Sequence, residues 1–335
     1  MKKGLLVLII VCSAIIFAGL IFVGISIAVV GGNFERLGRE VSYDEMNYSV
    51  AADGIQKIDV TDSNRKIFVR KSSDSQIHIK YYTNSKETYD ISDQNGELVF
   101  KYKNIRKWYD YINIFTFDIQ PVYTEILLPE HVFESLSAKT SNGAIEAQDF
   151  KLEGECYLKT SNGSVSLSNL EINGKITAES SNGKVTLSAV KSNSKISAYT
   201  SNSSIYLYNI EAGGVDADSG NGKVELESVK STDTIKAGSS NGTITLSDVS
   251  SDTTIDVKTS NGKIELTRVA VGKSMTLKNS NGRISGTILG AMEDFNINSH
   301  TSNGDNNLPN GTTGKNKDLE IRTSNGKIEV QFVQE

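Results

Sequence analysis

The chain has 335 residues, of which 22% are charged, and its formal net charge is −5 at pH 7. The 35 basic and 40 acidic residues are interspersed, so the sequence has no basic patch of the kind that binds nucleic acid. There are only two cysteines, Cys12 and Cys156, and Cys12 lies in an apolar segment. This excludes a framework of disulfide bonds as the basis of the fold.

The segment from Gly4 to Val30 contains no charged residue. As a helix at about 1.5 Å per residue it would reach roughly 40 Å, enough to cross a hydrocarbon core of about 30 Å. The alternative is a cleaved signal peptide, whose apolar core is usually about 7 to 15 residues long. A lipoprotein signal at Cys12 is disfavoured because Val11, and not a small residue, precedes it. We therefore predict an uncleaved transmembrane helix over residues 4–30.

Lys2 and Lys3 are the only charged residues before this helix. Because positive charge is enriched on the cytoplasmic side of membrane helices, residues 1–3 are predicted to be cytoplasmic. The protein would then be a single-pass protein of the plasma membrane, held there by residues 4–30. Residues 31–45 would form a polar linker, and everything after it would be extracellular.

A tetrapeptide of the Thr-Ser-Asn-Gly type occurs ten times between residues 140 and 326. Its asparagines are 20, 20, 20, 19, 20, 20, 20, 22 and 22 residues apart, which is typical of a solenoid or another repeat architecture. The repeated Asn-Gly positions are Asn142, Gly143, Asn162, Gly163, Asn182, Gly183, Asn202 (followed by Ser203), Asn221, Gly222, Asn241, Gly242, Asn261, Gly262, Asn281, Gly282, Asn303, Gly304, Asn325 and Gly326.

Apolar and polar residues alternate on both sides of each asparagine, which indicates strands with one buried face. Around Asn261, for example, Ile255 and Val257 precede it, and Ile264 and Leu266 follow. A single Asn-Gly between such strands is typical of a β-hairpin, but near-identical units of 20 residues can stack copy on copy. We therefore predict a parallel stack with left-handed Asn and Gly conformations at the corner and a ladder of Asn amides.

The predicted fold class is all-β: a parallel β-solenoid (β-helix) of about ten 20-residue coils with an N-terminal β cap, preceded by one transmembrane helix. The solenoid would span residues 131–335 and the cap residues 46–130, with a degenerate coil around Asp62-Ser63-Asn64-Arg65. Near the C-terminus, the segment 305–311 is predicted to be a loop in place of a second strand. Trp108, Tyr109 and Tyr111 in the cap are either core residues or a contact surface.

The sequence predicts no catalytic, cofactor-binding or metal site. His78, His131 and His300 are far apart and lack metal-ligand spacing with another His or Cys. The best carboxylate group comprises Asp216, Asp218 and Asp256, which are expected to point outward with Lys236 between coils. They could serve acid–base chemistry, or they could belong to a solvated ladder of alternating charges.

The Thr-Ser-Asn-Gly repeats followed by Ile/Val-x-Leu, from Thr140 to Gly326, resemble the putative-adhesin family of β-strand-repeat proteins. This family includes LiaG-like membrane proteins of Gram-positive bacteria and is built on a domain of unknown function. The resemblance covers roughly residues 50–333, and Ser203 and the Pro309 loop depart from it. It implies a protein of the cell envelope, sometimes connected with adhesion or envelope stress, and it supplies no catalytic residues.

The leading hypothesis is a non-enzymatic, membrane-anchored cell-surface protein that acts as an adhesin or scaffold for a protein or glycan of the envelope. The alternative is a carbohydrate-active β-helix enzyme that acts on an envelope polysaccharide through Asp216, Asp218 and Asp256. A third hypothesis is a filament protein, which would need exposed and compatible solenoid ends.

Overall fold

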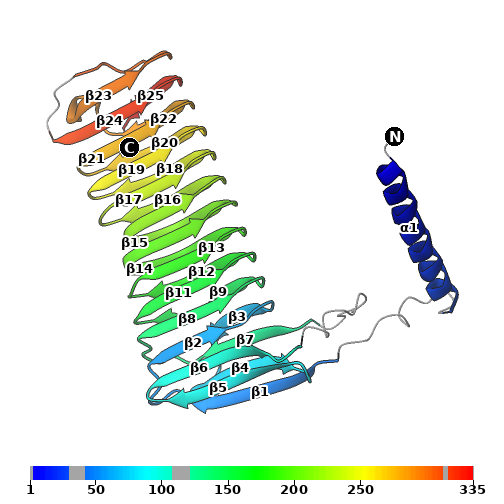
Figure 1. Cartoon of the computed structure of the whole chain (residues 1–335). Coiled ribbons are helices and arrows are strands. Elements are labelled where there is room, and N and C mark those ends of the chain that lie inside the picture. Colours follow the sequence, from blue (N-terminus) through cyan, green and yellow to red (C-terminus); the bar gives the residue numbers. More distant parts are fainter. Residues whose placement is uncertain (1–2, 30–41, 108–120, 312–315, 335) are drawn as a thin grey trace. The chain divides into compact units, whose positions relative to one another are not determined.

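The computed structural model describes residues 3–29, 42–107, 121–311 and 316–334 (Figure 1). They belong to two compact units, of which the smaller contains helix α1 (Lys3–Val29). Within α1, the segment Val7–Ile25 has a mean hydropathy of 3.0 and is not buried in the protein. By length and composition α1 could cross a membrane, and a signal sequence meets the same criteria. Trp108, Tyr109, Tyr111 and most of the predicted linker lie outside the described residues.

The larger unit spans residues 45–81, 89–103 and 123–335 and contains nearly all of the strands. The described strands before the regular coils are β1 (Asp44–Ala51), β2 (Lys57–Thr61), β3 (Lys66–Lys71), β4 (Gln76–Thr83), β5 (Glu87–Gln94), β6 (Glu97–Asn104) and β7 (Tyr123–Leu128). The regular coils then begin at residue 135.

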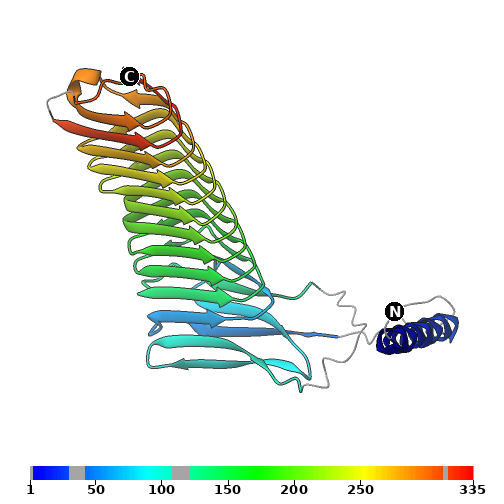
Figure 2. The same ribbon diagram turned by 45° about the horizontal axis from the view of Figure 1, so that its top comes forward.

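Each regular coil has three faces, with first-face strands before the Thr-Ser-Asn-Gly corner, second-face strands after it and a short third face (Figures 1 and 2). Several strands run round the bend from one face to the next. The strands are β8 (Ser135–Thr140), β9 (Ile145–Gln148), β10 (Lys151–Leu152), β11 (Glu155–Thr160), β12 (Val165–Ile172), β13 (Ile176–Ser180), β14 (Val185–Thr200), β15 (Ile205–Ser219), β16 (Val224–Ser231), β17 (Ile235–Ser239), β18 (Ile244–Ser251), β19 (Thr254–Thr259), β20 (Ile264–Val271), β21 (Ser274–Asn279), β22 (Ile284–Leu289), β23 (Phe295–Thr301), β24 (Lys317–Thr323) and β25 (Ile328–Val333), with a 3-10 turn at Met292–Asp294.

Strands of successive coils pair in parallel and in register. Ile176 lies beside Ile196, and Val185 lies beside Ile205. A hairpin would instead pair each strand antiparallel with its neighbour in sequence. The predicted parallel β-solenoid is therefore confirmed, and the hairpin alternative is wrong for the repeats.

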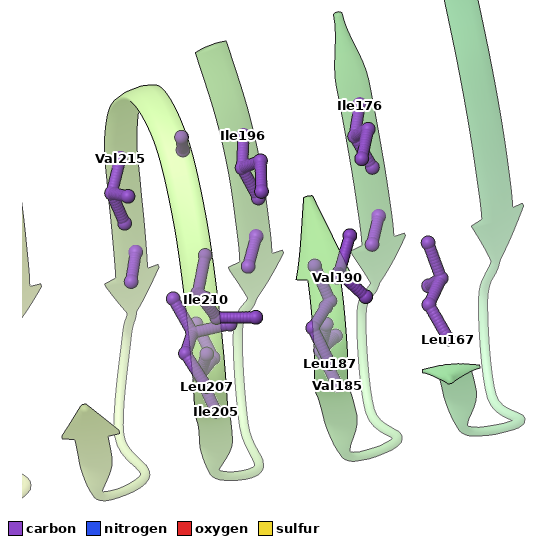
Figure 3. Close-up of a cluster of buried hydrophobic side chains, with 14 of the residues drawn as sticks. Leu167, Ile176, Val185, Leu187, Val190, Ile196, Ile205, Leu207, Ile210 and Val215 are labelled. Carbon is purple, nitrogen blue, oxygen red and sulfur yellow. The ribbon is translucent and has the colours of Figure 1, made fainter. Parts of the chain in front are cut away.

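The core is a set of columns of aliphatic side chains along the inside of the solenoid (Figure 3). Val185, Leu187 and Val190 come from one coil, and Ile205 and Leu207 lie beside Val185 and Leu187 in the next. All five are 0% exposed. Burial of each such side chain contributes about 1.5–3 kcal/mol, so the alternating pattern of the repeat explains most of the stability of the stack.

At the N-terminal end the order of the strands differs from their order in the sequence. Strands β2 and β3 stack on β8 and β9, the first regular coil. Strands β6 and β7 then pair with the opposite edges of β2 and β3. Strand β4 adds antiparallel to β7, so this edge continues into an antiparallel cap and does not end as an open parallel strand.

At the C-terminal end the last coil in the sequence is not the outermost one. Strand β24 lies between β21 and β23, because Leu319 has Met275 on one side and Ile297 on the other. The segment 305–311 is irregular, and the Asn307 amide bonds to both backbone polar groups of Val330, at 2.8 and 3.0 Å. Leu308 folds inward and is 6% exposed. A side-chain amide and a buried leucine thus replace a strand at this end.

Cys156 lies on the inward side of β11, and burial raises the pKa of its thiol to about 12. The unfolded thiol titrates near its ordinary value of 9, so this contribution to stability is complete below pH 9 and is lost as the pH rises toward 12.

In full-length protein with Cys12→Ser, held in detergent, we expect iodoacetamide at pH 8 to modify Cys156 only when denaturant unfolds the solenoid. A Cys12→Ser/Cys156→Ser/Ser161→Cys variant, with the thiol at an exposed corner, should react without denaturant. Equal rates at the two positions would contradict the buried assignment.

Candidate functional site

The asparagines of the repeat form one column of amides along the solenoid. Each Nδ2 donates to the Oδ1 of the preceding coil, as in Asn162 to Asn142 (2.6 Å) and Asn182 to Asn162 (2.7 Å). The column runs through Asn64, Asn142, Asn162, Asn182, Asn202, Asn221, Asn241, Asn261, Asn281, Asn325 and Asn303, in that spatial order. These residues therefore bond to one another and serve the architecture of the corner.

The predicted left-handed conformation of this corner is wrong, because neither its asparagines nor its glycines have a positive φ. Glycine is needed there for a different reason. A Cβ on Gly163 would lie 1.9 Å from the carbonyl oxygen of Gly143 in the preceding coil. The corner glycines thus allow successive backbones to approach closely.

The left-handed residues occupy the next corner, between the second and third faces. They fall seven residues after most of the repeat asparagines, with φ between 50° and 61°. They are Asp149, Asn169, Ala189, Asn209, Ser228, Asp248 and Arg268. Asp and Asn tolerate this region best and fill four of the seven positions, a signal in the sequence that was missed.

Ala189 (φ 52°) is strained in this second column, because alanine tolerates a positive φ less well than asparagine or aspartate. Its neighbour Asn169 already donates to Asp149 Oδ1 at 3.0 Å. Ala189→Asn is expected to stabilise the protein by about 0.5–1 kcal/mol, because asparagine is less strained at positive φ and can extend the amide column. Urea unfolding of the full-length protein in detergent measures this. The control Ala144→Asn, at a position without positive φ, should change stability by less than about 0.5 kcal/mol. A loss of stability in Ala189→Asn would contradict the argument.

On the first face, the structure brings two of the three candidate aspartates together. Asp216 and Asp218 both project from β15, whereas Asp256 lies two strands away with Lys236 between it and Asp216. Asp256 Oδ2 is 2.7 Å from Lys258 Nζ. Asp256 therefore belongs to the ladder of alternating charges and not to a group with the other two.

Asp216 is already engaged by two side chains. Its Oδ2 lies 2.7 Å from Lys195 Nζ and accepts a hydrogen bond from the Tyr199 hydroxyl at 3.1 Å. Burial raises the pKa of Tyr199, with Asp216 adding to the effect, so this hydroxyl keeps its proton and remains a donor. Asp216 is thus held in a defined place beside Asp218.

Asp218 differs from the other carboxylates of this face. Among the described residues its side chain has neither a hydrogen bond nor an ion pair. Its Oδ1 lies over Gly238, where an added Cβ would be 2.3 Å away. Partial burial, and then the nearby Asp216, raise the pKa of its carboxyl group. Asp218 is therefore a carboxylate that a positively charged ligand would stabilise.

A cavity of about 370 Å³ lies beside Asp218. Side chains from several successive coils line it, most of them polar: Lys159, Thr160, Glu179, Ser180, Ser181, Tyr199, Thr200, Ser201 and Asp218, together with Gly220. Lys159 and Glu179 form an ion pair at 2.9 Å, and Tyr157 donates to Glu179 at 3.3 Å. The cavity is within the size range of small-ligand sites.

The histidines do not contribute to this site. His78 lies 2.9 Å from Asp74, His131 packs against Phe133 and His300 lies beside Arg322. In the described part of the chain, no three His, Cys, Asp or Glu side chains are grouped so that they could hold a metal ion.

Comparison with family models accounts for the whole repeat region, with matches over residues 55–247 and 173–333. The chain belongs to the Toastrack DUF4097 family. The match confirms the resemblance that the Thr-Ser-Asn-Gly repeats indicated. No curated protein matches this Toastrack chain.

The solved structures that are similar to this chain have low sequence identity to it. A "putative adhesin" from Bacteroides fragilis is 12% identical with a TM-score of 0.40, and a "putative lipid binding protein" from Parabacteroides distasonis is 14% identical with a TM-score of 0.44. In both cases the match covers 88% of this chain and 100% of the other. A "putative cell adhesion protein" from Clostridium sporogenes, 12% identical with a TM-score of 0.23, matches 87% of this chain and all of its own.

Proposed function

We propose that this protein is a non-enzymatic cell-surface protein, anchored in the plasma membrane by α1, whose solenoid is a scaffold that presents a face to a partner in the envelope. The observation that carries the proposal is the unbroken parallel stack marked by the amide column from Asn64 to Asn303. Such a stack has a continuous core and a regular outer surface, which suits display over a distance.

The outer charges support the same function. Among the described residues, most of the ion pairs join neighbouring coils, as in Lys191–Glu211 (3.0 Å) and Lys278–Glu320 (3.0 Å). Exposed pairs of this type contribute little energy and keep the surface solvated. They are spread along the faces and do not converge on one reacting position.

The topology can be tested with the Cys12→Ser/Cys156→Ser/Ser161→Cys variant, which carries one thiol at an exposed corner. A membrane-impermeant maleimide should label it on intact cells, because two lysines before α1, Lys2 and Lys3, favour a cytoplasmic N-terminus. Labelling only after permeabilisation would contradict the proposal. The intact mass of the protein from membranes distinguishes the two roles of α1, since an anchor remains attached and a signal sequence is removed.

A carbohydrate-active enzyme is the second candidate, because Asp216 and Asp218 lie together on β15, Asp218 lines a cavity, and paired carboxyl groups can serve acid–base chemistry. The full-length protein in detergent should release no reducing ends from cell-wall polysaccharides. If reducing ends are released and Asp218→Asn abolishes that release, the scaffold function is overturned.

We further propose a link to the envelope stress response, which predicts that a deletion strain responds abnormally to cell-wall-damaging agents.

A further inference from the structure

The outward-facing tyrosines of the regular coils are grouped in one part of the solenoid. They are Tyr157, Tyr199, Tyr206 and Tyr208, all in strands β11 to β15. Ser203, the only one of the ten Thr-Ser-Asn-Gly-type corners without glycine, is in the same stretch. In a regular repeat, a local departure from the consensus indicates a requirement other than the fold.

On the second face, Tyr206 and Tyr208 pack against each other. The rings of Tyr206 and Tyr208 stack with their centroids 5.9 Å apart, and Lys184 Nζ lies 5.5 Å from the centre of the Tyr206 ring. Glu227, next to Tyr208 in register, has no hydrogen bond or ion pair among the described residues. It offers a carboxylate without a partner, but it does not line the 370 Å³ cavity beside Asp218.

On the first face the corresponding residues line a cavity. Tyr199 and Asp218 lie side by side in register on β14 and β15, and both line the 370 Å³ cavity. Lys195 compensates Asp216, whereas Asp218 has no cation beside it among the described residues. Because Gly238 has no side chain, the Asp218 carboxylate can lie against its backbone, at one end of the cavity.

We propose that this cavity binds a saccharide that carries a primary amine. The inference rests on the proposed surface function and specifies its ligand. The ammonium group would pair with Asp218, and the apolar face of the sugar ring would lie against Tyr199. The exposed hydroxyls of Ser181 and Ser201, with Lys159, would bond to the sugar hydroxyls. A lysine side chain of a protein would use Asp218 alone and would make no use of Tyr199 or of the Ser181 and Ser201 hydroxyls, which favours the saccharide.

The test is calorimetric titration of the full-length protein in detergent with three probes: β-1,4-linked glucosamine tetramer, its N-acetylated form and tetralysine. We expect the glucosamine tetramer to bind at least tenfold more tightly than either of the others. Asp218→Asn and Tyr199→Ala should each weaken it at least tenfold. The matched control is Glu227→Gln, which neutralises the other free carboxylate beside a tyrosine and should leave the affinity unchanged. Urea unfolding shows whether each variant is folded.

Equal binding of the acetylated tetramer would overturn the contact between the amine and Asp218. Stronger binding of tetralysine would overturn the saccharide in favour of a basic protein. Absence of binding, or an equal effect of Glu227→Gln and Asp218→Asn, would overturn the site. Labelling of Ser161→Cys on intact cells depends on none of these results, so the proposed surface function is decided separately.

Discussion

Gly242→Ala is expected to lower the free energy of unfolding by about 2–3 kcal/mol. The added Cβ would lie 1.9 Å from the carbonyl oxygen and 2.3 Å from the carbonyl carbon of Gly222. Both atoms belong to the backbone, so no side chain can rotate away. The coils must move apart at the corner, which weakens the backbone and amide bonds on both sides.

The matched control for this change is Gly214→Ala in the same solenoid. A Cβ there would meet nothing closer than 3.5 Å, and Gly214 does not have a positive φ. This variant should be as stable as the wild type or slightly more stable, because alanine restricts the unfolded chain. Urea unfolding of the full-length protein in detergent, followed by the β-sheet circular dichroism signal, measures both. If Gly242→Ala lowers the free energy of unfolding by less than about 1 kcal/mol, the coils can move apart at this corner at little cost, which would contradict the prediction.

Asp62→Ala is expected to cost about 3 kcal/mol, because Asp62 is the centre of a buried polar cluster in the cap. Asp62, Arg65, Tyr89 and Thr124 are each at most 8% exposed. Asp62 Oδ2 accepts hydrogen bonds from the Tyr89 hydroxyl (2.6 Å) and from Thr124 (2.8 Å), and Arg65 donates to Tyr89 at 2.8 Å. The substitution removes one acceptor from two buried hydroxyls and a negative charge near the buried guanidinium.

The control for Asp62→Ala is Asp90→Ala, which breaks the exposed ion pair with Lys103 at 3.2 Å. Exposed pairs contribute about 0–1 kcal/mol, so this variant should unfold close to the wild-type urea concentration. Similar losses in the two variants would contradict the central role of Asp62.

The same cluster predicts a dependence on alkaline pH. Burial, and then the Asp62 charge, raise the pKa of Tyr89 above its ordinary value of 10. The folded protein therefore keeps this proton at a pH where the unfolded chain releases it. The stabilisation is complete below pH 10 and is lost progressively above it. Tyr89→Phe should show a smaller loss of stability between pH 9 and pH 11 than the wild type.

The candidate site was only partly predictable. Asp216 and Asp218 were expected to point outward on one coil, and the place of Asp216 beside Lys236 follows from the repeat period alone. The contribution of Tyr199 was missed, although outward tyrosines occur only between residues 157 and 208 of the regular coils. Asp216 has side-chain partners and Asp218 has none because the Lys195 and Tyr199 side chains are both directed at Asp216. The spacing of residues in the sequence does not predict these side-chain conformations.

The architecture of the repeats could be predicted from the amino-acid sequence. A period of 20 residues, with apolar residues at alternate positions, can bury a continuous core only if equivalent strands stack in register. That information is local and is repeated in every coil, so each copy reinforces the prediction made from the others.

The ends of the solenoid, its corners and the cap could not be predicted from the repeat and became clear from the folded structure. The position of β24 between β21 and β23, and the Asp62 cluster that joins residues up to 62 positions apart, depend on contacts that occur once in the chain. The glycine after each repeat asparagine is required by the close approach of two backbones and not by a positive φ. The residues with positive φ lie at the next corner, in the column that contains Asp149 and Asn169. A periodic pattern specifies what is repeated, whereas contacts that occur only once are fixed by the shape of the folded chain.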